Sequence, residues 1–358
     1  MQHYHIGVIP GDGIGRDVTR EALRVLSAVS EVISSFSLEY EVFPWGSEYY
    51  ASHARMMPSG ALKSLEAFDA IYFGAVGSPS VPDHVTLHGL RLEICQGFDQ
   101  YVSLRPALLL PGVQSPLRNI APNDVDLVVV RENTEGEYSG AGGRVHRGLP
   151  EEVGLEIALF SKNGISRVAE YAFSVAERRD CRRLAYVTKS NAQRHGFLLW
   201  DEVCDGVAAE HPSIATERVL VDAMAARFVL QPETLDVVLA SNLHGDILSD
   251  LAGAICGSLG MAPSGNINPE RNYPSMFEPI HGSAPDISGS GMANPVAMIW
   301  SGAMMLEFLG ETEASGIVLS GIRDVLSENE NLTPDIGGKA STVEVGDAIV
   351  RNIQAIAA

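Results

Sequence analysis

The sequence predicts an α/β fold with a mainly parallel sheet, and three observations support this prediction. Apolar runs of strand length alternate with segments of helical periodicity along the chain. Several of these runs are followed at once by polar residues, as at the carboxyl ends of strands in open α/β sheets. The 358 residues contain no internal repeat or low-complexity tract.

The individual elements follow from the same patterns. We expect strands at His5–Pro10, Asp69–Val76, Asp126–Arg131, Arg183–Thr188 and Leu235–Ala240. We expect helices at Asp17–Val29, Ser166–Arg178, Arg194–Ala209, Asp246–Ile255, Pro295–Leu309 and Val343–Ile356. The chain is expected to change domain at the Leu104–Arg105–Pro106 step and in the Gly-rich stretch Gly257–Gly265.

The composition excludes several classes of partner. With 45 acidic and 25 basic residues the formal net charge is −20, which repels nucleic acids and anionic membranes. There is no apolar run of the ~18 residues that a membrane span needs, and no secretory signal is apparent. Four widely spaced cysteines favour reduced thiols. We therefore expect a cytoplasmic protein without nucleic-acid or membrane partners.

The N-terminal segment Gly11-Asp-Gly13-Ile-Gly15-Arg16 follows a predicted strand and precedes a predicted helix. Its spacing excludes a Rossmann dinucleotide site, because arginine stands where the third glycine should be. It also lacks the Gly-Lys-Ser/Thr of a P-loop. We interpret it as a tight turn that lets the backbone approach a neighbouring loop or a ligand.

Three predicted strands end in polar groups that should meet at one edge of the sheet. These endings are Arg131-Glu132-Asn133, Thr188-Lys189-Ser190-Asn191 and Ser241-Asn242 with the nearby Gly245-Asp246. Since ligands bind outside the carboxyl ends of strands in such sheets, the three endings together predict a small-molecule site.

Asp246 and Asp250 add a candidate metal site. They are spaced i, i+4, which places both carboxylates on one face of the predicted helix. A cation between them, Mg²⁺ or Mn²⁺, would offset their repulsion. Asp222 is a third candidate ligand. From the residues alone, helix capping by Asp246 and Asp222 and simple solvation of Asp250 are the favoured alternatives.

The motifs together resemble the β-decarboxylating dehydrogenase family, which includes isocitrate, 3-isopropylmalate, tartrate and D-malate dehydrogenases. The matching stretches are IPGDGIG, FDQYVSLRP, VVVRENTEGEYSG, TKSN, SNLHGDILSD and FEPIHGSAPDISGSGMANP. They occur in the family's order and cover nearly the whole chain. The stretches RENTEGEYS, ARFVLQPE and PSGNINPERNYPSMFEPIHGSAPDI look most like the tartrate/D-malate branch.

This resemblance implies an isopropylmalate-dehydrogenase-like fold of two domains, not a Rossmann fold. Residues 1–104 and 259–358 would form a discontinuous cofactor-binding domain. Residues 105–258 would form a domain for substrate, metal and dimerisation, with an arm near 140–159 that contacts a partner subunit. The resemblance also implies a homodimer whose active site is shared between subunits.

The resemblance further implies roles for individual residues of the substrate domain. Tyr138 matches the general acid that protonates carbon after carbon dioxide leaves, and Lys189 matches the lysine that serves as base. Metal-binding carboxylates are matched by Asp222, Asp246 and Asp250, with Lys189 and Asp222 coming from the neighbouring subunit. The planar forks of Arg105 and Arg131 match arginines that bind substrate carboxylates.

A dinucleotide loop is implied by the same resemblance. The residues that match it are His281, Gly282, Ser283, Ala284, Pro285, Asp286, Ile287 and Asn294. A carboxylate such as Asp286 accepts hydrogen bonds from both ribose hydroxyls and repels a 2′-phosphate. We therefore expect NAD rather than NADP as cofactor, together with Mn²⁺ or Mg²⁺, and K⁺ as a further candidate.

The sequence departs from the family at positions that bear on the substrate. Cys95 stands where the family has a further arginine and is read as a small buried hydrophobe. Arg91, one helical turn earlier, is a hypothetical substitute. His244 replaces a residue that is more often aromatic, without an account from sequence. The loop Ser78–His88 has neither a long apolar patch nor the serine–asparagine arrangement of isocitrate enzymes, which favours a malate-sized substrate.

The resulting hypothesis is an NAD- and metal-dependent enzyme that oxidises and decarboxylates a small 2-hydroxy dicarboxylate such as D-malate or tartrate. Within the same class, 3-isopropylmalate or another 3-substituted malate is the alternative substrate. A non-catalytic regulatory paralogue is the alternative of another class. It is disfavoured because the lysine, the tyrosine and the aspartates are all present. A nucleotide-binding module without chemistry would leave the aspartates unexplained.

Overall fold

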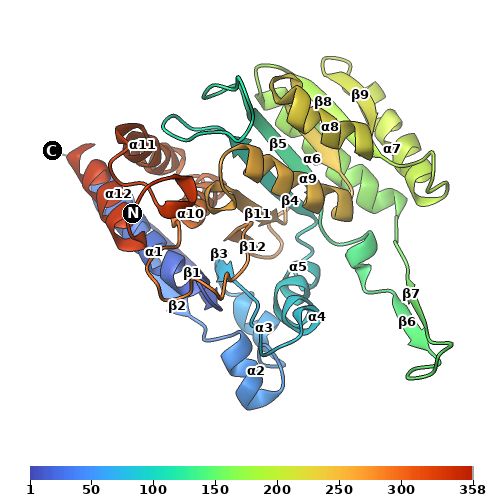
Figure 1. Cartoon of the computed structure of the whole chain (residues 1–358), viewed down its shortest axis with the longest axis horizontal. Helices are drawn as coiled ribbons and strands as arrows, with labels where there is room; N and C mark the ends of the chain where they lie inside the picture. Colours follow the sequence, from blue (N-terminus) through green and yellow to red (C-terminus); the bar gives the residue numbers. More distant parts are fainter. Residues whose placement is uncertain (357–358) are drawn as a thin grey trace. The chain divides into compact units, whose positions relative to one another are not determined.

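The computed structural model describes residues 1–356, and the chain divides into two compact units (Figure 1). The first unit contains residues 1–100 and 106–125 and the chain from Gly253 onward. The second unit contains residues 101–105 and 126–252.

The first unit is a sheet of α/β type with its strands in the order β2-β1-β3-β12-β11. The first four of these strands run parallel, and β11 is antiparallel to β12. The strands are β1 (Gln2–Gly11), β2 (Phe36–Val42), β3 (Ala70–Ala75), β11 (Pro263–Ile267) and β12 (Ser275–Pro279). The α-helices are α1 (Gly15–Ile33), α2 (Ser47–His53), α3 (Ala61–Leu65), α4 (Asp83–Thr86), α5 (Leu92–Gly97), α10 (Val296–Leu309), α11 (Thr312–Glu328) and α12 (Thr342–Ile356). Shorter turns are the π-helical η1 (Leu87–Arg91) and the 3₁₀ turns η4 (Leu259–Met261) and η5 (Pro334–Ile336).

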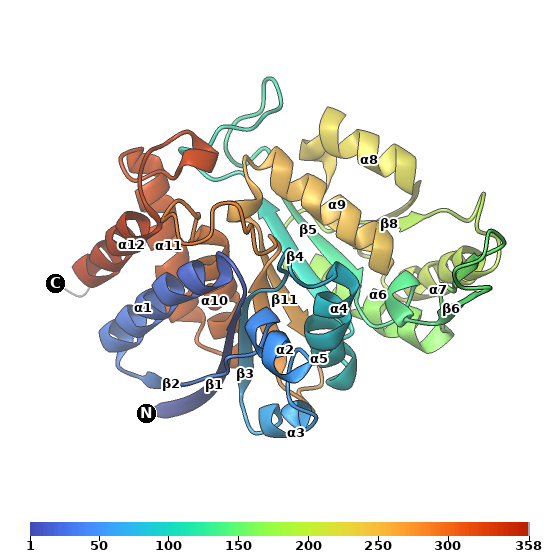
Figure 2. The ribbon, with the colours of Figure 1, turned by 60° about the horizontal axis from the view of Figure 1, so that its bottom comes forward.

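Both faces of this sheet are buried, as the near-continuous apolar strands predict. On β3, Ile71 and Phe73 pack into a core with Leu65, Ile94 and other side chains from α3 and α5. Tyr72 points to the opposite face, where its hydroxyl donates to the carbonyl of Met298 in α10. Figure 2 shows α1 and α10–α12 gathered on one side of β1 and β3, and α2, α3 and α5 on the other. None of the described helices, α10 included, is both long and apolar enough to span a bilayer.

The second unit has its strands in the order β4-β5-β10-β8-β9, with β5, β10, β8 and β9 parallel. The strands are β4 (Val102–Leu108), β5 (Asp126–Glu132), β8 (Arg183–Thr188), β9 (Ala215–Leu220) and β10 (Val237–Ala240). The α-helices are α6 (Lys162–Arg178), α7 (Gly196–Glu210), α8 (Val221–Leu230) and α9 (Asn242–Ile255), and the 3₁₀ turns are η2 (Glu137–Ser139) and η3 (Pro232–Thr234). Helix α6 packs on β5, β8 and β10, so its apolar stripe closes the core of this unit.

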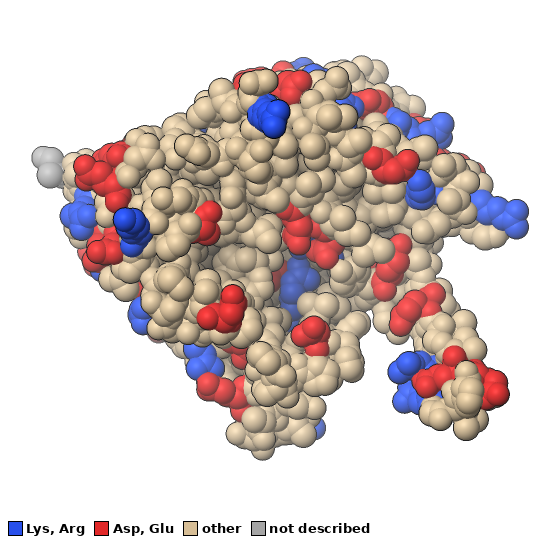
Figure 3. Space-filling model, in the orientation of Figure 1, with Lys and Arg blue, Asp and Glu red and all other residues tan. Residues whose placement is uncertain are grey.

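A separate antiparallel hairpin, β6 (Gly142–Val145) and β7 (Val153–Glu156), extends from the second unit. Its large apolar side chains are exposed: Val145 by 49%, Val153 by 45% and Leu155 by 56%. Side chains of both charges gather at its far end (Figure 3), where Arg144 and Glu152 form an ion pair. Because a lone two-stranded ribbon is marginally stable, this hairpin is suited to packing against another surface.

All predicted strands and helices are confirmed to within a few residues at each end. The largest extensions are at the end of α1, which reaches Ile33, and at the starts of α6 and α9, which begin at Lys162 and Asn242. The prediction missed β2, β4, β6, β7, β9, β11 and β12, the helices α8 and α11, and the short helices of the first unit. None of the residues of strand β9 is buried, which explains why hydrophobic periodicity did not indicate it.

The observed units differ in part from the predicted domain boundaries. The chain leaves the second unit after Arg105 and again after Ala252. Residues 106–125 and 253–258 therefore lie in the first unit and residues 101–104 in the second, whereas the predicted boundaries assign them the other way round. The roles predicted for the two domains stay predictions.

His211, at the C-terminal end of α7, should make stability depend on pH. Its Nδ1 and Nε2 lie 2.9 Å and 3.1 Å from carboxylate oxygens of Glu177 and Glu170. The hydrogen bond with Glu177 raises the pKa of His211. Partial burial lowers it, and the contact with Glu170 raises it further. A raised pKa stabilises the fold below the usual histidine value of about 6.5, and this contribution is lost as pH rises through the folded-state pKa.

We expect His211→Gln to lower the melting temperature by about 1–3 °C at pH 5.5 and by less at pH 9. Thermal unfolding followed by circular dichroism at both pH values measures the difference. His84→Gln, at an exposed histidine, is the control. An equal loss at both pH values would contradict the assignment.

Candidate active site

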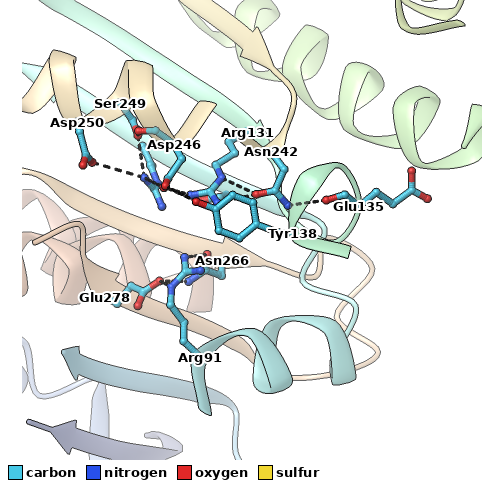
Figure 4. Close-up of polar contacts among 12 residues, drawn as sticks. Arg91, Arg131, Glu135, Tyr138, Asn242, Asp246, Ser249, Asp250, Asn266 and Glu278 are labelled. Atoms are coloured by element: carbon cyan, nitrogen blue, oxygen red, sulfur yellow. Dashed lines mark hydrogen bonds and ion pairs between the residues drawn. The ribbon is translucent and has the colours of Figure 1, made fainter. Parts of the chain in front are cut away.

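In the second unit, three side chains converge on the carboxylate of Asp246 in α9 (Figure 4). Arg131, at the end of β5, forms an ion pair with its Oδ1. Arg105, on β4, places Nη1 3.2 Å from the same oxygen. The hydroxyl of Tyr138, in η2, donates to Oδ2 at 2.8 Å. The structure thus brings together four of the residues that the sequence predicted for the site.

Arg105 and Arg131 are both buried, so their positive charges need a nearby negative charge, which the Asp246 carboxylate supplies. Arg131 is 1% exposed and Arg105 is 5% exposed. Arg105 also donates to the hydroxyl of Ser249 at 2.8 Å, and the Arg131 guanidinium lies 5.1 Å from the ring centroid of Tyr138. Burying an unpaired charge is strongly unfavourable, so the ion pairs hold the guanidiniums in place.

The loop that carries Tyr138 is anchored at both of its flanks. Asn242, the first residue of α9, accepts from Nε and Nη2 of Arg131 at 3.1 Å and 2.6 Å and donates to the carbonyl of Glu135 at 2.9 Å. The Glu135 carboxylate accepts from the backbone and hydroxyl of Ser161, which caps α6. Gly245 is required here, because a Cβ atom would lie 2.7 Å from Cβ of Arg131.

Asp250 lies one helical turn beyond Asp246, as the i, i+4 spacing predicted. Its carboxylate is 4.0 Å from Arg105 Nη1, and its side chain is 54% exposed. Partial burial raises the pKa of Asp250, the neighbouring Asp246 raises it further, and Arg105 opposes both effects. Hard oxygen donors on one exposed helix face fit Mg²⁺ or Mn²⁺.

Lys189 and Asp222 form a pair of their own in the second unit. Lys189 follows β8, and its Nζ lies 2.5 Å from Oδ1 of Asp222 at the start of α8. The Lys189 ammonium lowers the pKa of Asp222. Within residues 1–356 no three His, Cys, Asp or Glu side chains lie together as a metal site. One chain therefore does not assemble Asp222, Asp246 and Asp250.

His244 lies in α9 and is buried. Its ring stacks on Phe197 of α7 with 4.8 Å between centroids, and its Nδ1 is buried without a partner among the described residues. Burial, aided by the charge of Lys189, lowers the pKa of His244 to about 4. The imidazole is therefore neutral and packs as an aromatic ring would, which accounts for histidine at this position.

In the first unit, the Gly11–Gly15 turn meets the predicted dinucleotide loop. The amide of Ile14 donates to the carbonyl of Ser283 at 2.8 Å. Gly13 has a φ of +56°, and a Cβ atom there would lie 2.0 Å from the Ser283 carbonyl oxygen. The interpretation of this segment as a tight turn that approaches a neighbouring loop is confirmed.

Asp12, which the sequence did not single out, fixes two more loops to this turn. It is 5% exposed. Its Oδ1 accepts from the Ser47 amide at 2.8 Å, and its Oδ2 accepts from the Ser47 hydroxyl at 2.7 Å and the Gly77 amide at 3.0 Å. A cavity of about 350 Å³, here called the loop cavity, opens beside it, lined by Asp12, Gly13, Arg16, Ser47, Glu48, Gly77, Pro285 and Ser288 among others.

The residues of the predicted dinucleotide loop are only partly buried. Asp286 is exposed, and Ala284 has a φ of +38°, a strained conformation of the kind found at ligand sites. Burial lowers the pKa of His281, whose Nδ1 is 2.9 Å from the Gly282 carbonyl. Asn294 donates to Asp335 at 3.1 Å, so Asp335 orients it. The sequence analysis did not predict a role for Asp335, and its TPDIGG context is the one signal that could have indicated it.

The prediction that Cys95 is a buried hydrophobe is confirmed, because it is 0% exposed within the first unit's core. Arg91, in the π-helical turn η1, donates from Nε to Glu278 at 2.7 Å and from Nη2 to Asn266 at 3.3 Å (Figure 4). Glu278 lies near the carboxyl end of β12, three residues before His281. The guanidinium is therefore held at the strand edge where ligands bind in such sheets.

Comparisons with known proteins identify the family of the chain. The family model described as isocitrate/isopropylmalate dehydrogenase matches residues 5–349. A probable tartrate dehydrogenase/decarboxylase of Agrobacterium vitis is 56% identical over 99% of this chain and 98% of its own. The D-malate dehydrogenase [decarboxylating] of Escherichia coli strain K12 is 49% identical over 99% of both chains. A crystal structure of isocitrate dehydrogenase from Methylococcus capsulatus superimposes with a TM-score of 0.89 at 32% identity, over 98% of this chain and 99% of that one.

The fold, the site and these relatives define an enzyme, a dehydrogenase of the decarboxylating class. The chain belongs to the isocitrate/isopropylmalate dehydrogenase family. The predicted resemblance and the predicted isopropylmalate-dehydrogenase-like α/β fold are thereby confirmed. The roles of individual site residues stay predictions.

Gly13→Ala should damage the predicted dinucleotide site without unfolding the unit. The new Cβ would collide with the Ser283 carbonyl and force this loop aside. We expect the Kd for NADH to rise about tenfold or more, equivalent to a loss of about 1.4 kcal/mol. Fluorescence titration with NADH measures it.

Gly316→Ala is the matched control, because nothing lies within 4 Å of a Cβ atom at this position of α11. Unchanged dinucleotide affinity in Gly13→Ala, with the variant folded, would contradict the role of the turn.

Proposed function

We propose that this protein oxidises and decarboxylates a small 2-hydroxy dicarboxylate with NAD and a divalent metal, and that D-malate or tartrate is the substrate. The observation that carries the proposal is the convergence of Arg105, Arg131 and Tyr138 on Asp246. Two buried cations in a protein of net charge −20 serve to attract a small anion. The loop Ser78–His88 and the tartrate and D-malate enzymes among the relatives favour a malate-sized acid.

Arg105 and Arg131 would bind the substrate's carboxylates. Their planar forks suit bidentate contacts, and their burial makes each contact stronger than in water. The Arg91 guanidinium is held by Glu278 and Asn266. It is a candidate for the substrate contact of the family's further arginine, whose position Cys95 occupies here. The hydrogen bond to Asp246 and the stacking with Arg131 already orient the Tyr138 hydroxyl.

The proton transfers would then be divided between two residues. Lys189 would accept the proton of the substrate's hydroxyl, and NAD, when bound, would supply the hydride acceptor. After carbon dioxide departs, Tyr138 donates its phenolic proton to the carbon. The regulatory-paralogue alternative lacks support, because Lys189, Tyr138 and the aspartates are all retained.

Asp246 and Asp250, completed by Asp222 of a second copy, are the residues that would hold Mn²⁺ or Mg²⁺. The ion would supply Lewis-acid polarisation of the substrate's oxygens. The exposed carboxylate of Asp250 and the separate Lys189–Asp222 pair support this assignment, because that pair is then available to a neighbouring subunit. K⁺ is a further candidate cofactor.

We assign the dinucleotide to the loop of His281–Ile287 with Asn294, and its ribose hydroxyls to Asp286. The positive φ of Ala284 and the Asp335–Asn294 hydrogen bond support this role. The exposed carboxylate of Asp286 favours NAD over NADP, because a 2′-phosphate would be repelled. The β6–β7 hairpin, with its exposed apolar side chains, is assigned to the homodimer contact.

A panel of hydroxy acids tests the activity. The purified protein is assayed for NADH formation at 340 nm with D-malate, L-malate, tartrate isomers, 3-isopropylmalate and isocitrate, with Mn²⁺ and with EDTA. We expect the highest kcat/KM for D-malate or a tartrate and loss of turnover in EDTA. Preference for 3-isopropylmalate would establish the alternative substrate, and full activity in EDTA would remove the metal from the scheme.

Mixed dimers test whether the site is shared between subunits. If Lys189 of one chain serves Asp246 of the other, mixing inactive Lys189→Met and Asp246→Asn subunits should create one intact site in every mixed dimer. Random exchange should then restore about one quarter of the wild-type activity, because half of the dimers are mixed and each has one intact site.

Each variant alone is the control and should show almost no turnover. Circular dichroism checks that both fold, and differently tagged subunits confirm exchange by pull-down. Exchange without recovery of activity would place both residues in the same site of one chain.

A further inference from the structure

The base of the β6–β7 hairpin lies close in the chain to the proposed general acid. Strand β6 begins at Gly142, four residues after Tyr138. Where the chain enters and leaves the hairpin, the amide of Gly136 donates to the carbonyl of Leu159 at 2.8 Å, and the amide of Leu159 donates back at 3.1 Å. These two residues form what we call the neck of the hairpin. Because an exposed two-stranded ribbon is marginally stable by itself, its motion would reach Tyr138 unless the neck is held.

The carboxylate of Glu135 fixes the neck to helix α6. Its Oε2 accepts from the backbone amide of Ser161 at 2.8 Å, and its Oε1 accepts from the Ser161 hydroxyl at 2.5 Å. The same hydroxyl accepts from the amide of Gly164 at 2.9 Å and thereby caps α6. Both oxygens of Glu135 are therefore held by donors at the positive end of a 17-residue helix.

Gly164 leaves the space that this carboxylate occupies. A Cβ atom at Gly164 would lie 2.5 Å from Cδ and Oε2 of Glu135 and 2.7 Å from its Oε1. Alanine is a better helix former than glycine, so helix stability alone would favour a side chain at this third residue of α6. The glycine instead permits the close approach of Glu135.

The backbone of Glu135 extends this attachment toward the site (Figure 4). Its carbonyl accepts from Nδ2 of Asn242 at 2.9 Å, and Asn242 accepts in turn from the guanidinium of Arg131. Its amide donates to the two carboxylate oxygens of Glu132 at 3.0 Å and 2.9 Å. Glu135 is thus tied to β5, α6 and α9 at once, and Tyr138 follows it by three residues.

From these contacts we propose that Glu135 is a positioning residue: its carboxylate holds the neck still and so keeps the Tyr138 hydroxyl at its place on Asp246 while the hairpin moves. The proposal rests on the proposed function, in which Tyr138 is the general acid. A misplacement of about 1 Å can lower a rate about a hundredfold. Glu135 has no proposed contact with the substrate or the dinucleotide, so their binding should be retained.

Two substitutions break the contact by different means. Glu135→Gln puts an amide group against a donor of Ser161, and Gly164→Ala pushes the intact carboxylate away. We expect each to lower kcat about tenfold or more, with the KM for the hydroxy acid and the Kd for NADH changed less than about twofold. The matched controls in α7 are Glu202→Gln, at an exposed glutamate, and Gly206→Ala, where nothing lies within 4 Å of a Cβ atom.

Fluorine NMR measures the placement of Tyr138 without turnover. Protein labelled with 3-fluorotyrosine gives signals from its 10 tyrosines, and Tyr138→Phe identifies the signal of Tyr138. We expect Glu135→Gln and Gly164→Ala to shift or broaden this signal selectively. The melting temperature should change by less than about 2 °C, because Gly164→Ala also favours the helix.

An unchanged Tyr138 signal, or full kcat in both variants, would overturn the positioning role. A loss of kcat with a matching loss of melting temperature and changes in many fluorine signals would overturn it as well, because it would show a merely structural role. Full turnover in Tyr138→Phe, or an inactive wild type with a selective change of the Tyr138 signal in the variants, would instead overturn the proposed function.

Discussion

The charge compensation of Arg105 and Arg131 by Asp246 is the interaction on which the second unit's site depends. Two guanidiniums that are almost inaccessible to water require a counter-charge, and α9 supplies it from its second turn. The same carboxylate receives the Tyr138 hydroxyl, so one side chain orients a strand end, a neighbouring strand and a loop. Under the proposed function, a dicarboxylic acid would offer the arginines new counter-charges and would free Asp246 to act as a metal ligand.

In the first unit, four loops are held close together without a large cluster of charges. They are held by backbone contacts that only glycine permits at Gly11 and Gly13, and by one buried carboxylate, Asp12, that accepts from two neighbouring loops. Neutral backbone groups dominate this site, whereas ionised side chains dominate the other. Under the proposed function, this division suits a large dinucleotide, which is recognised by shape, and a small diacid, which is recognised by charge.

Sequence reasoning was most reliable where local spacing determines geometry. The strand ends that present Arg131 and Lys189 and the i, i+4 pair Asp246 and Asp250 could be predicted, because strand and helix periods fix them. The partner of Asp222 could not, because its contact with Lys189 joins residues 33 positions apart. Asp12 and Asp335 were missed for the same reason, since loops distant in sequence give them their importance. The contacts of Arg91 with Glu278 and Asn266 could not be predicted either, because they depend on the π-helical turn η1, which no residue pattern indicates.

The β6–β7 hairpin has a consequence for how the molecule behaves at low concentration. Its two strands bond only to one another within the described chain, and their apolar side chains face solvent. Such a ribbon gains little from folding by itself, so its order depends on what covers it. If the hairpin forms the proposed contact with a second copy, dilution that separates the copies would expose this segment first to proteases and to edge-to-edge association, while the two units remain folded.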